Sequence, residues 1–246
     1  MLTLALSFLV IALLYSTVGF GGGSSYIAIL AVANVVYTMI PKISLLCNLV
    51  VVSIGCYQFY KNDLLSKKLI LPFVLSSVPM AFLGGLYPIK EKTFFILLSV
   101  SLILCGVRLL FIKDKQVNEV KVPSNGVSLA LGAVLGLLSG MVGIGGGIFL
   151  SPILINMGWA RSKDAAAVSS IFILLNSLAG LGGQFTKDPT FVDFGTYFPL
   201  FIAVFVGGQI GSRIGTHSKV SYRMIQVGTG VLTLFISGKL LLKVIV

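Results

Sequence analysis

The chain has 246 residues, of which 57% are hydrophobic and only 10% charged, whereas a soluble domain has about 25% charged residues. A 26.1 kDa globule cannot bury that much apolar surface, so a water-soluble fold is excluded and lipid is the expected solvent. The formal net charge is +11, but the basic residues stand between apolar runs, which indicates membrane topology rather than nucleic-acid binding. No stretch is long enough for a separate soluble catalytic or DNA-binding domain, so the transmembrane part is expected to carry the function.

Apolar runs of helical length follow one another along the whole chain. In the first half they cover residues 2–18, 24–40, 43–60, 69–87 and 94–112, and in the second half 127–141, 148–159, 165–183, 191–211 and 224–246. The polar stretch 113–126 between them is predicted to be a linker on the cytoplasmic side. The pattern predicts an all-α polytopic membrane protein with about 8 to 10 membrane segments, of which some are too short to span alone and are expected to be broken or re-entrant.

The second half repeats features of the first. VGFGGG at 18–23 recurs as VGIGGG at 142–147, and the Gly pair at 84–85 recurs at 207–208. Single matches are common in a chain with 28 glycines, but two matches in the same order indicate a duplication. We therefore expect two homologous transmembrane repeats, residues 1–112 and 127–246, joined by the linker 113–126.

The distribution of Lys and Arg favours inverted repeats. If the first two segments of each half return to the side on which they start, the second half is inverted and the basic residues divide 12 against 6 between the two sides. If those segments form one broken span, the division is 10 against 8 and carries almost no orientation signal. Eight spans arranged as two parallel sets of four remain the alternative.

The glycine runs predict breaks in helices. Gly costs about 1 kcal/mol relative to Ala in a helix, so three consecutive glycines favour unwinding, and the exposed amides must then be buried in protein or line a wet cavity. Ser24 and Ser25 are expected to be N-cap residues of the next segment, and Ser151 and Pro152 to lie in the first turns of its second copy. Two helix starts that face each other would attract an anion. Close helix packing is the alternative role for such glycines.

These repeated glycine runs, the Ser151-Pro152 pair and the Gly pairs resemble the TauE/SafE family of membrane transporters over essentially the whole chain. The resemblance implies duplicated halves and export of sulfite and organosulfonates, or uptake of related sulfur anions. The family pattern has a proline five residues after the last glycine of the run. Pro152 fits this pattern, but the first half has Ala28 there, so the first half is expected to bind more loosely or only to support the second.

Neutral polar residues inside the apolar runs complete the predicted binding site. An alignment of PKISLLCN with RSKDAAAVS places Asn48 opposite Ser169, and both could hydrogen-bond sulfonate oxygens; the alternative role is hydrogen bonding between helices. The predicted substrate-binding set is Gly19, Gly21, Gly22, Gly23, Ser24, Ser25, Asn48, Gly143, Gly145, Gly146, Gly147, Ser151, Pro152, Ser169, Ser170 and Asn176.

Chemistry beyond transport has no support in the sequence. The apolar runs contain no catalytic triad, paired carboxylates or metal-ligand cluster, and the chain has no P-loop, so we expect neither an enzyme nor a cofactor but a gradient-driven secondary transporter. An anion channel, or a non-catalytic subunit of a larger membrane complex, is the alternative. The expected partners are a small inorganic or organic sulfur anion and the lipid of a prokaryotic cell membrane, crossed many times. Coupling to a proton, for which Asp164 is the candidate, and homo-oligomer formation are left open.

Overall fold

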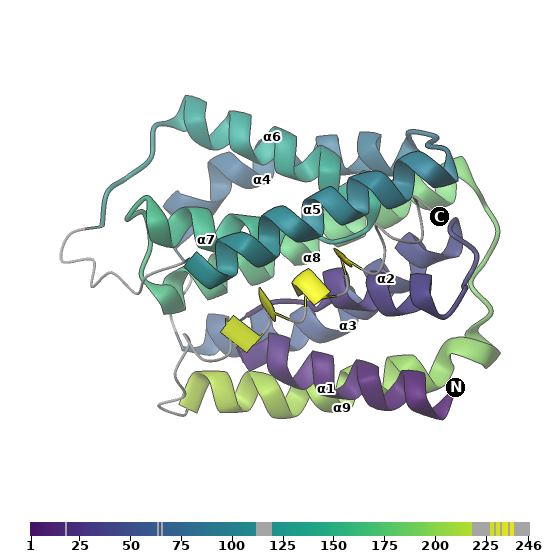
Figure 1. The fold of residues 1–246 in the computed structure, drawn as a ribbon. Helices are drawn as coiled ribbons and strands as arrows, with labels where there is room; N and C mark the ends of the chain where they lie inside the picture. The colour runs from purple at the N-terminus through teal and green to yellow at the C-terminus, as the bar shows by residue number, and fades with distance from the viewer. Residues whose placement is uncertain are drawn as a thin grey trace.

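The computed structural model describes residues 1–17, 19–62, 64, 66–111 and 120–217, with 227–228, 230–231, 233–235 and 237–238 near the C-terminus. These residues form helices and connecting turns, without a strand, as the sequence predicted. The helices are α1 (Leu2–Thr17), α2 (Gly23–Val32), α3 (Met39–Lys61), α4 (Lys67–Leu86), α5 (Glu91–Phe111), α6 (Asn125–Val142), α7 (Gly147–Asn156), α8 (Ser162–Lys187) and α9 (Phe194–His217). Figure 1 shows them as a bundle with roughly aligned axes.

Two kinds of helix differ in length. Among the described residues, five helices are long and apolar enough to cross a membrane: Met39–Lys61, Lys68–Leu86, Asn125–Val142, Ser162–Lys187 and Phe194–Gly215. By contrast, α2 and α7 have 10 residues each, which gives a length of about 15 Å, half of a hydrocarbon core about 30 Å thick. The chain is therefore a multi-pass membrane protein that contains two half-length helices.

One predicted segment was wrong in its extent. The apolar run 24–40 was expected to be one segment, but α2 ends at Val32 and α3 already begins at Met39, before the expected residue 43. Asn34 adopts the left-handed conformation, with φ of 58°, which Asn tolerates better than most residues. The helix stops there because this backbone conformation cannot continue it. The last predicted run, 224–246, and residues 112–119 of the linker region lie largely outside the described residues.

Two seams of small residues hold the outer helices close together. Three glycines of α6 spaced four apart lie against the α4 backbone or side chains, with Gly132 near Phe73, Gly136 near Ser77 and Gly140 near Ala81. In the same way, three glycines of α9 lie against α1, with Gly207 near Leu9, Gly211 near Leu13 and Gly215 near Thr17. A side chain at any of these positions would collide with backbone, so the seams depend on glycine. Residue numbers rise together along both seams, so the paired helices run parallel.

Helices α3 and α8 cross at the centre in opposite directions. Gly55 lies near Ser170, and Gly180 lies near Leu45, so residue numbers rise in one helix as they fall in the other. Followed along the colour bar of Figure 1, α1, α3 and α9 run in one direction and α4, α6 and α8 in the other. Thus α1 runs opposite to α6, α3 runs opposite to α8, and α4 runs opposite to α9.

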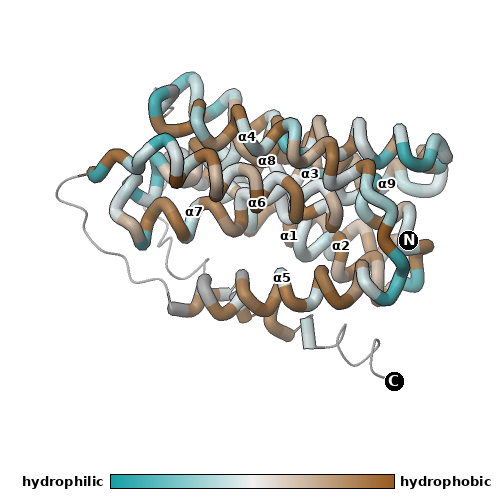
Figure 2. The backbone as a smooth tube through the Cα atoms, turned by 90° about the horizontal axis from the view of Figure 1, so that it is seen from above, coloured by the Kyte–Doolittle hydropathy of each residue, from teal (hydrophilic) through white to brown (hydrophobic). Residues whose placement is uncertain are grey.

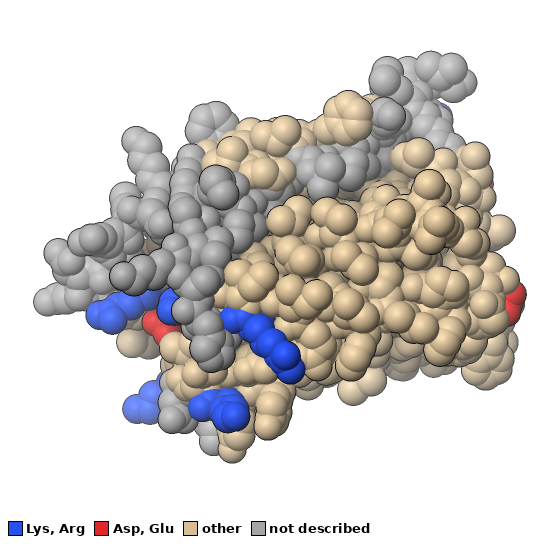
Figure 3. Space-filling view, turned by 90° about the horizontal axis from the view of Figure 1, so that it is seen from below, with Lys and Arg blue, Asp and Glu red and all other residues tan. Residues whose placement is uncertain are grey.

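Helix α5 lies at one edge of the bundle. Figure 2 shows it apart from the other helices and beside the described C-terminal residues, and Gly106 packs against Leu234. Figure 3 shows that one face of the molecule is mostly uncharged, with its Lys and Arg side chains mainly at one end. A wide uncharged surface between charged ends suits a lipid environment.

Candidate anion site at two glycine runs

Both glycine runs interrupt a helix, as the sequence predicted. The first glycine run (Gly19–Gly23) separates α1 from α2, and the second glycine run (Gly143–Gly147) separates α6 from α7. Each half-length helix begins after a glycine in the left-handed conformation, Gly22 with φ of 82° and Gly146 with φ of 78°. L-residues reach this conformation at a cost of about 1–2 kcal/mol, which explains why glycine stands there.

Neither half-length helix has a side-chain cap. The hydroxyl of Ser124 accepts a hydrogen bond from the amide of Val127 at the start of α6, whereas Gly22 and Gly146 have no side chain that could do the same for α2 and α7. The first turn of a helix has amides without partners inside the helix and carries the positive end of the dipole. Both helix starts are therefore built like sites that accept a negative group.

The expected cap roles of Ser24 and Ser25 were wrong, whereas Ser151 and Pro152 lie where they were expected. Ser24 and Ser25 lie inside the first turn of α2 and do not cap it, because the helix already begins at Gly23; the Ser25 hydroxyl is 2.7 Å from the Tyr15 hydroxyl instead. Ser151 and Pro152 are the fifth and sixth residues of α7, which begins at Gly147, and so lie in its first turns as expected. Gly23 itself enters the helix, so Ser24 and Ser25 lie inside its first turn instead of before it.

Each run packs against the central helix of the other half of the chain. Gly19 lies against the backbone of Ala166 in α8, and the Ser170 hydroxyl donates to the Gly19 carbonyl at 2.9 Å. Gly143 lies against the backbone of Pro41 in α3, and a hydroxyl of the same helix donates to its carbonyl at 3.0 Å. That hydroxyl belongs to Ser44, which is also 3.2 Å from the Gly23 carbonyl and so reaches both runs.

The side-chain amide of Asn48 lies between the two runs. Its Nδ2 donates to the Ile144 carbonyl of the second run at 3.0 Å. A Cβ atom on Gly21 would be 2.5 Å from Asn48 Oδ1, and a Cβ on Gly23 2.5 Å from Nδ2, so the amide also touches the first run. At the second run, a Cβ on Gly145 would be 2.8 Å from Asn48 Nδ2. Glycine is required here because any side chain would displace this amide.

The residue that occupies the corresponding place at the second run is Ile173. Its side chain lies against Gly145 and Gly147, as Asn48 lies against Gly21 and Gly23. The predicted pairing of Asn48 with Ser169 was therefore wrong, and Ser169 corresponds to Ser44. Asn48 stands 27 residues after Gly21, whereas Ile173 stands 28 residues after Gly145, so the two halves differ by one residue in this spacing.

Many polar atoms around the runs are buried without a hydrogen-bond partner. They include Asn48 Oδ1 and the hydroxyls of Ser24, Ser139, Ser169 and Ser177; elsewhere in α8, both amide atoms of Asn176 are also buried without a partner. Ser177 Oγ would lie 3.1 Å from a Cβ on Gly145, and the Ser139 Cβ 3.3 Å from a Cβ on Gly146, so these two hydroxyl residues flank the second run. An unpaired buried polar group costs about 1–3 kcal/mol, so such a concentration suits a site that a ligand completes.

The structure brings together only part of the predicted set. The predicted glycines of the two runs, Asn48, Ser169 and Ser170 meet around the runs, while Ser151, Pro152 and Asn176 are buried but have no described contact with them. Sequence reasoning left Ser44, Ser139, Ile173 and Ser177 out of the site. Spacing would have helped, because Ser44 and Asn48, like Ser169, Ile173 and Ser177, are four apart and share a helix face.

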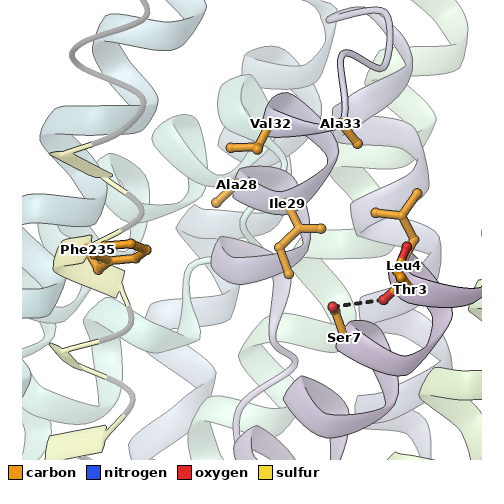
Figure 4. A pocket seen from close by; sticks show the side chains of 8 residues that line it. All are labelled: Thr3, Leu4, Ser7, Ala28, Ile29, Val32, Ala33 and Phe235. Carbon is orange, nitrogen blue, oxygen red and sulfur yellow. Dashed lines mark hydrogen bonds between the residues drawn. The ribbon is translucent and has the colours of Figure 1, made fainter.

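Two of the three described cavities lie away from the glycine runs, and the third lies beside the second run. One of about 300 Å³ is mainly apolar and lies between α1, α2 and Phe235 (Figure 4). A second, of about 250 Å³, is lined by Asp164, Lys68 and Lys121, and a third, of about 180 Å³, reaches Pro41 and Met141 beside the second run. None of these three cavities is lined by a glycine of either run, and all glycines of both runs are buried, so the candidate site is closed to solvent in this structure.

A buried cation holds the end of α8 next to the third cavity. Lys42 is fully buried, and its ammonium donates to the Asp188 carboxylate at 3.0 Å and to the Asp188 and Thr190 carbonyls at 2.7 and 2.9 Å. Hydrogen bonds from Thr190 and from Lys42 lower the pKa of Asp188 to about 2. The bond to the Asp188 carboxylate compensates the positive charge of Lys42. The other two bonds give hydrogen-bond partners to carbonyls at the C-terminal end of α8.

Comparison with known proteins agrees with this architecture. The family model described as "Sulfite exporter TauE/SafE" matches residues 4–240. The "Probable membrane transporter protein y4hK" of Sinorhizobium fredii is 34% identical over 217 residues, which is 87% of each chain. No solved structure matches the chain. The chain thus belongs to the TauE/SafE sulfite exporter family of membrane transporters.

Proposed function

We propose that this transporter moves small sulfur-containing oxyanions, such as sulfite, thiosulfate or organosulfonates, and binds them between its two glycine runs. The observation that carries the proposal is the position of Asn48, a fully buried amide that touches both runs and has an unpartnered oxygen. The proposal also rests on the family, whose description names sulfite export.

An anion is the ligand that the local electrostatics favour. The uncapped starts of α2 and α7 offer backbone amides and two positive dipole ends. None of the nearest neighbours that the structure gives for the two runs is acidic, so an anion there would meet no repulsive carboxylate. Burial in protein strengthens these interactions because little water screens them.

We further propose that residues 1–112 and 127–246 are inverted repeats joined by a linker at 113–126. Two observations support this: corresponding helices run in opposite directions, and the contacts are reciprocal, with Gly19 against α8 and Gly143 against α3. In transporters built from inverted repeats, the substrate binds near the middle of the membrane, between the repeats, where broken helices meet. The two runs have that position relative to α3 and α8.

A carrier mechanism fits the closed site better than a channel does. A channel needs a continuous passage, whereas the glycine runs line none of the three described cavities. We propose that opening toward either side separates the two halves around α3 and α8 in the prokaryotic cell membrane. The driving gradient is proposed to be a proton gradient; Asp164, in the first turn of α8, lines a cavity and is the candidate coupling acid.

Flux measurements in proteoliposomes test the proposal. The purified protein is expected to transport sulfite, thiosulfate or sulfoacetate, with saturation at high substrate concentration. Gly21→Leu and Gly145→Leu should abolish that flux, because each leucine would occupy the place of the Asn48 amide. Gly126→Leu is the matched control, because a Cβ at Gly126 meets nothing within 4 Å.

The outcomes separate the alternatives. Saturable flux that only Gly21→Leu and Gly145→Leu remove supports the proposed carrier and site. Currents that do not saturate would indicate an anion channel, while protein that neither binds nor moves any of the three anions would indicate a subunit of a larger complex. Full flux in correctly folded Gly21→Leu and Gly145→Leu would place the site elsewhere.

A further inference from the structure

The orientation of the Asn48 side chain is determined by its neighbour in the second run. The carbonyl oxygen of Ile144 accepts a hydrogen bond from Nδ2 at 3.0 Å. If the amide were rotated by 180°, its own oxygen would face that carbonyl, and two acceptors would repel each other. The amide oxygen is therefore directed toward the first run, where a Cβ on Gly21 would be 2.5 Å from it.

This orientation places a hydrogen-bond acceptor at the start of α2. Asn48 Oδ1 has no partner, and the whole side chain is 0% exposed. The oxygens of a fully deprotonated oxyanion are acceptors too, so they would be repelled at this point although the helix dipole attracts them. A ligand that carries an O–H group beside its charged oxygens would satisfy the amide oxygen instead.

The same amide also offers a donor. Nδ2 has two hydrogens, of which the Ile144 carbonyl takes one, and Nδ2 is close to both Gly23 and Gly145. On the far side of Gly145, the Ser177 hydroxyl is buried and unpartnered and provides another donor. Donors and one acceptor side by side match an acid group that has charged oxygens and one remaining O–H.

We propose that the site binds sulfite as hydrogen sulfite, HO–SO₂⁻, and not as SO₃²⁻, and that it prefers this anion to thiosulfate and organosulfonates, which carry no acidic O–H group on sulfur. This inference rests on the proposed function and adds the protonation state of the substrate to it. Asn48 is the specificity-determining residue: its oxygen accepts the O–H of the ligand, and its free N–H and the Ser177 hydroxyl donate to the charged oxygens. Ile173, in the corresponding place at the second run, has no polar atom and cannot repeat this recognition.

Methanesulfinate, CH₃–SO₂⁻, provides the decisive comparison, because it has the shape and charge of hydrogen sulfite but a methyl group instead of the O–H. Both anions are to compete with labelled sulfite for flux in proteoliposomes at mildly acidic pH, where sulfite is mainly hydrogen sulfite. Methanesulfinate is expected to compete at least about tenfold more weakly than hydrogen sulfite, because it leaves the buried Asn48 acceptor unpaired. Asn48→Leu should reduce this ratio of competition strengths to near one, whereas Gly126→Leu, which lies outside the site, should leave the ratio unchanged.

Equal competition by the two anions in the unaltered protein would overturn the inference while leaving the proposed function intact. An undiminished ratio in Asn48→Leu would overturn the assignment of Asn48. If Asn48→Leu does not fold, the comparison of the two anions in the unaltered protein still decides whether the site selects hydrogen sulfite. If no anion is transported, the proposed function fails, and ligand-induced thermal stabilisation by hydrogen sulfite and by methanesulfinate, measured in detergent, tests the selectivity separately.

Discussion

The first and second glycine runs have similar backbones but different side chains beside them. Both precede a helix of 10 residues, both place a left-handed glycine before it, and both lie against the central helix of the other half. At the first run the neighbouring side chain is Asn48, and at the second it is Ile173. The glycines therefore produce the break in the helix, whereas the side chain beside the break determines which ligand it can recognise.

The two central helices differ in the same way in their hydroxyl groups. The Ser44 hydroxyl reaches carbonyls of both runs, while the corresponding Ser169 hydroxyl has no partner. Helix α3 is thus bonded to both breaks in the closed structure, and α8 keeps unsatisfied groups near the second one. The sequence-based expectation that the first half binds more loosely is not what these contacts favour, because the amide that joins the runs belongs to the first half.

Asn176 should give the largest effect on stability. Both of its amide atoms are buried without partners, and the corresponding residue of α3 is Val51. Asn176→Val is expected to raise the free energy of unfolding by about 1–3 kcal/mol, because it removes an unsatisfied amide. Thermal or denaturant unfolding of the ligand-free protein in detergent measures this, with Val51→Asn as the opposite change, expected to destabilise. A less stable Asn176→Val would show that this amide has a structural partner.

Alanine substitutions distinguish the conformations of the two runs. Gly145 has a φ of 86°, whereas Gly21 is not among the glycines with positive φ. Gly145→Ala should therefore lower the free energy of unfolding by about 1–2 kcal/mol more than Gly21→Ala, although both disturb Asn48. Parallel unfolding curves of the two variants and of Gly126→Ala measure the difference. Equal losses would mean that contact with Asn48, and not backbone strain, dominates at both positions.

Ser44 and Ser169 test whether the Ser44 hydroxyl of α3 contributes more to the breaks than the corresponding Ser169 hydroxyl of α8 does. Ser44→Ala is expected to cost about 0.5–1.5 kcal/mol, because it removes a donor that serves the Gly23 and Gly143 carbonyls. Ser169→Ala should change the stability little or raise it slightly, since its hydroxyl has no partner. Thermal midpoints of the two variants provide the measurement. A larger loss for Ser169→Ala than for Ser44→Ala would contradict the asymmetry.

The Lys42–Asp188 pair should determine how stability changes with pH under acidic conditions. The pKa of Asp188 is lowered to about 2, so its contribution to stability is fully present above the unfolded value of about 3.9 and is lost as the pH falls toward 2. In Asp188→Asn, the thermal midpoint should change less with pH in that window. Near neutral pH, the midpoint of the variant should depend on pH as it does in the unaltered protein. An identical acid profile in the variant would show that other carboxylates control it.

Much of the architecture could be predicted from the sequence because it depends on local composition. The long apolar runs predicted membrane helices, and the repeated glycines predicted the interruptions after Thr17 and Val142. The helix starts could not be placed to the residue, because Gly23 and Gly147 enter the helices only when tertiary packing compensates for their low helix propensity. For the same reason Ser24 and Ser25 were wrongly expected to be caps.

Tertiary structure alone decided which side chains meet at the runs. The amino-acid sequence was enough to predict that the chain is helical, that it is embedded in lipid and that its helices break at two glycine runs, because hydrophobicity and backbone freedom are properties of short segments. It did not determine that Asn48 lies between both runs, or that Ile173 takes the corresponding place at the second. These contacts join segments about 100 residues apart, and their register depends on how α3 and α8 cross, since a shift of one residue turns a side chain by about 100° around its helix.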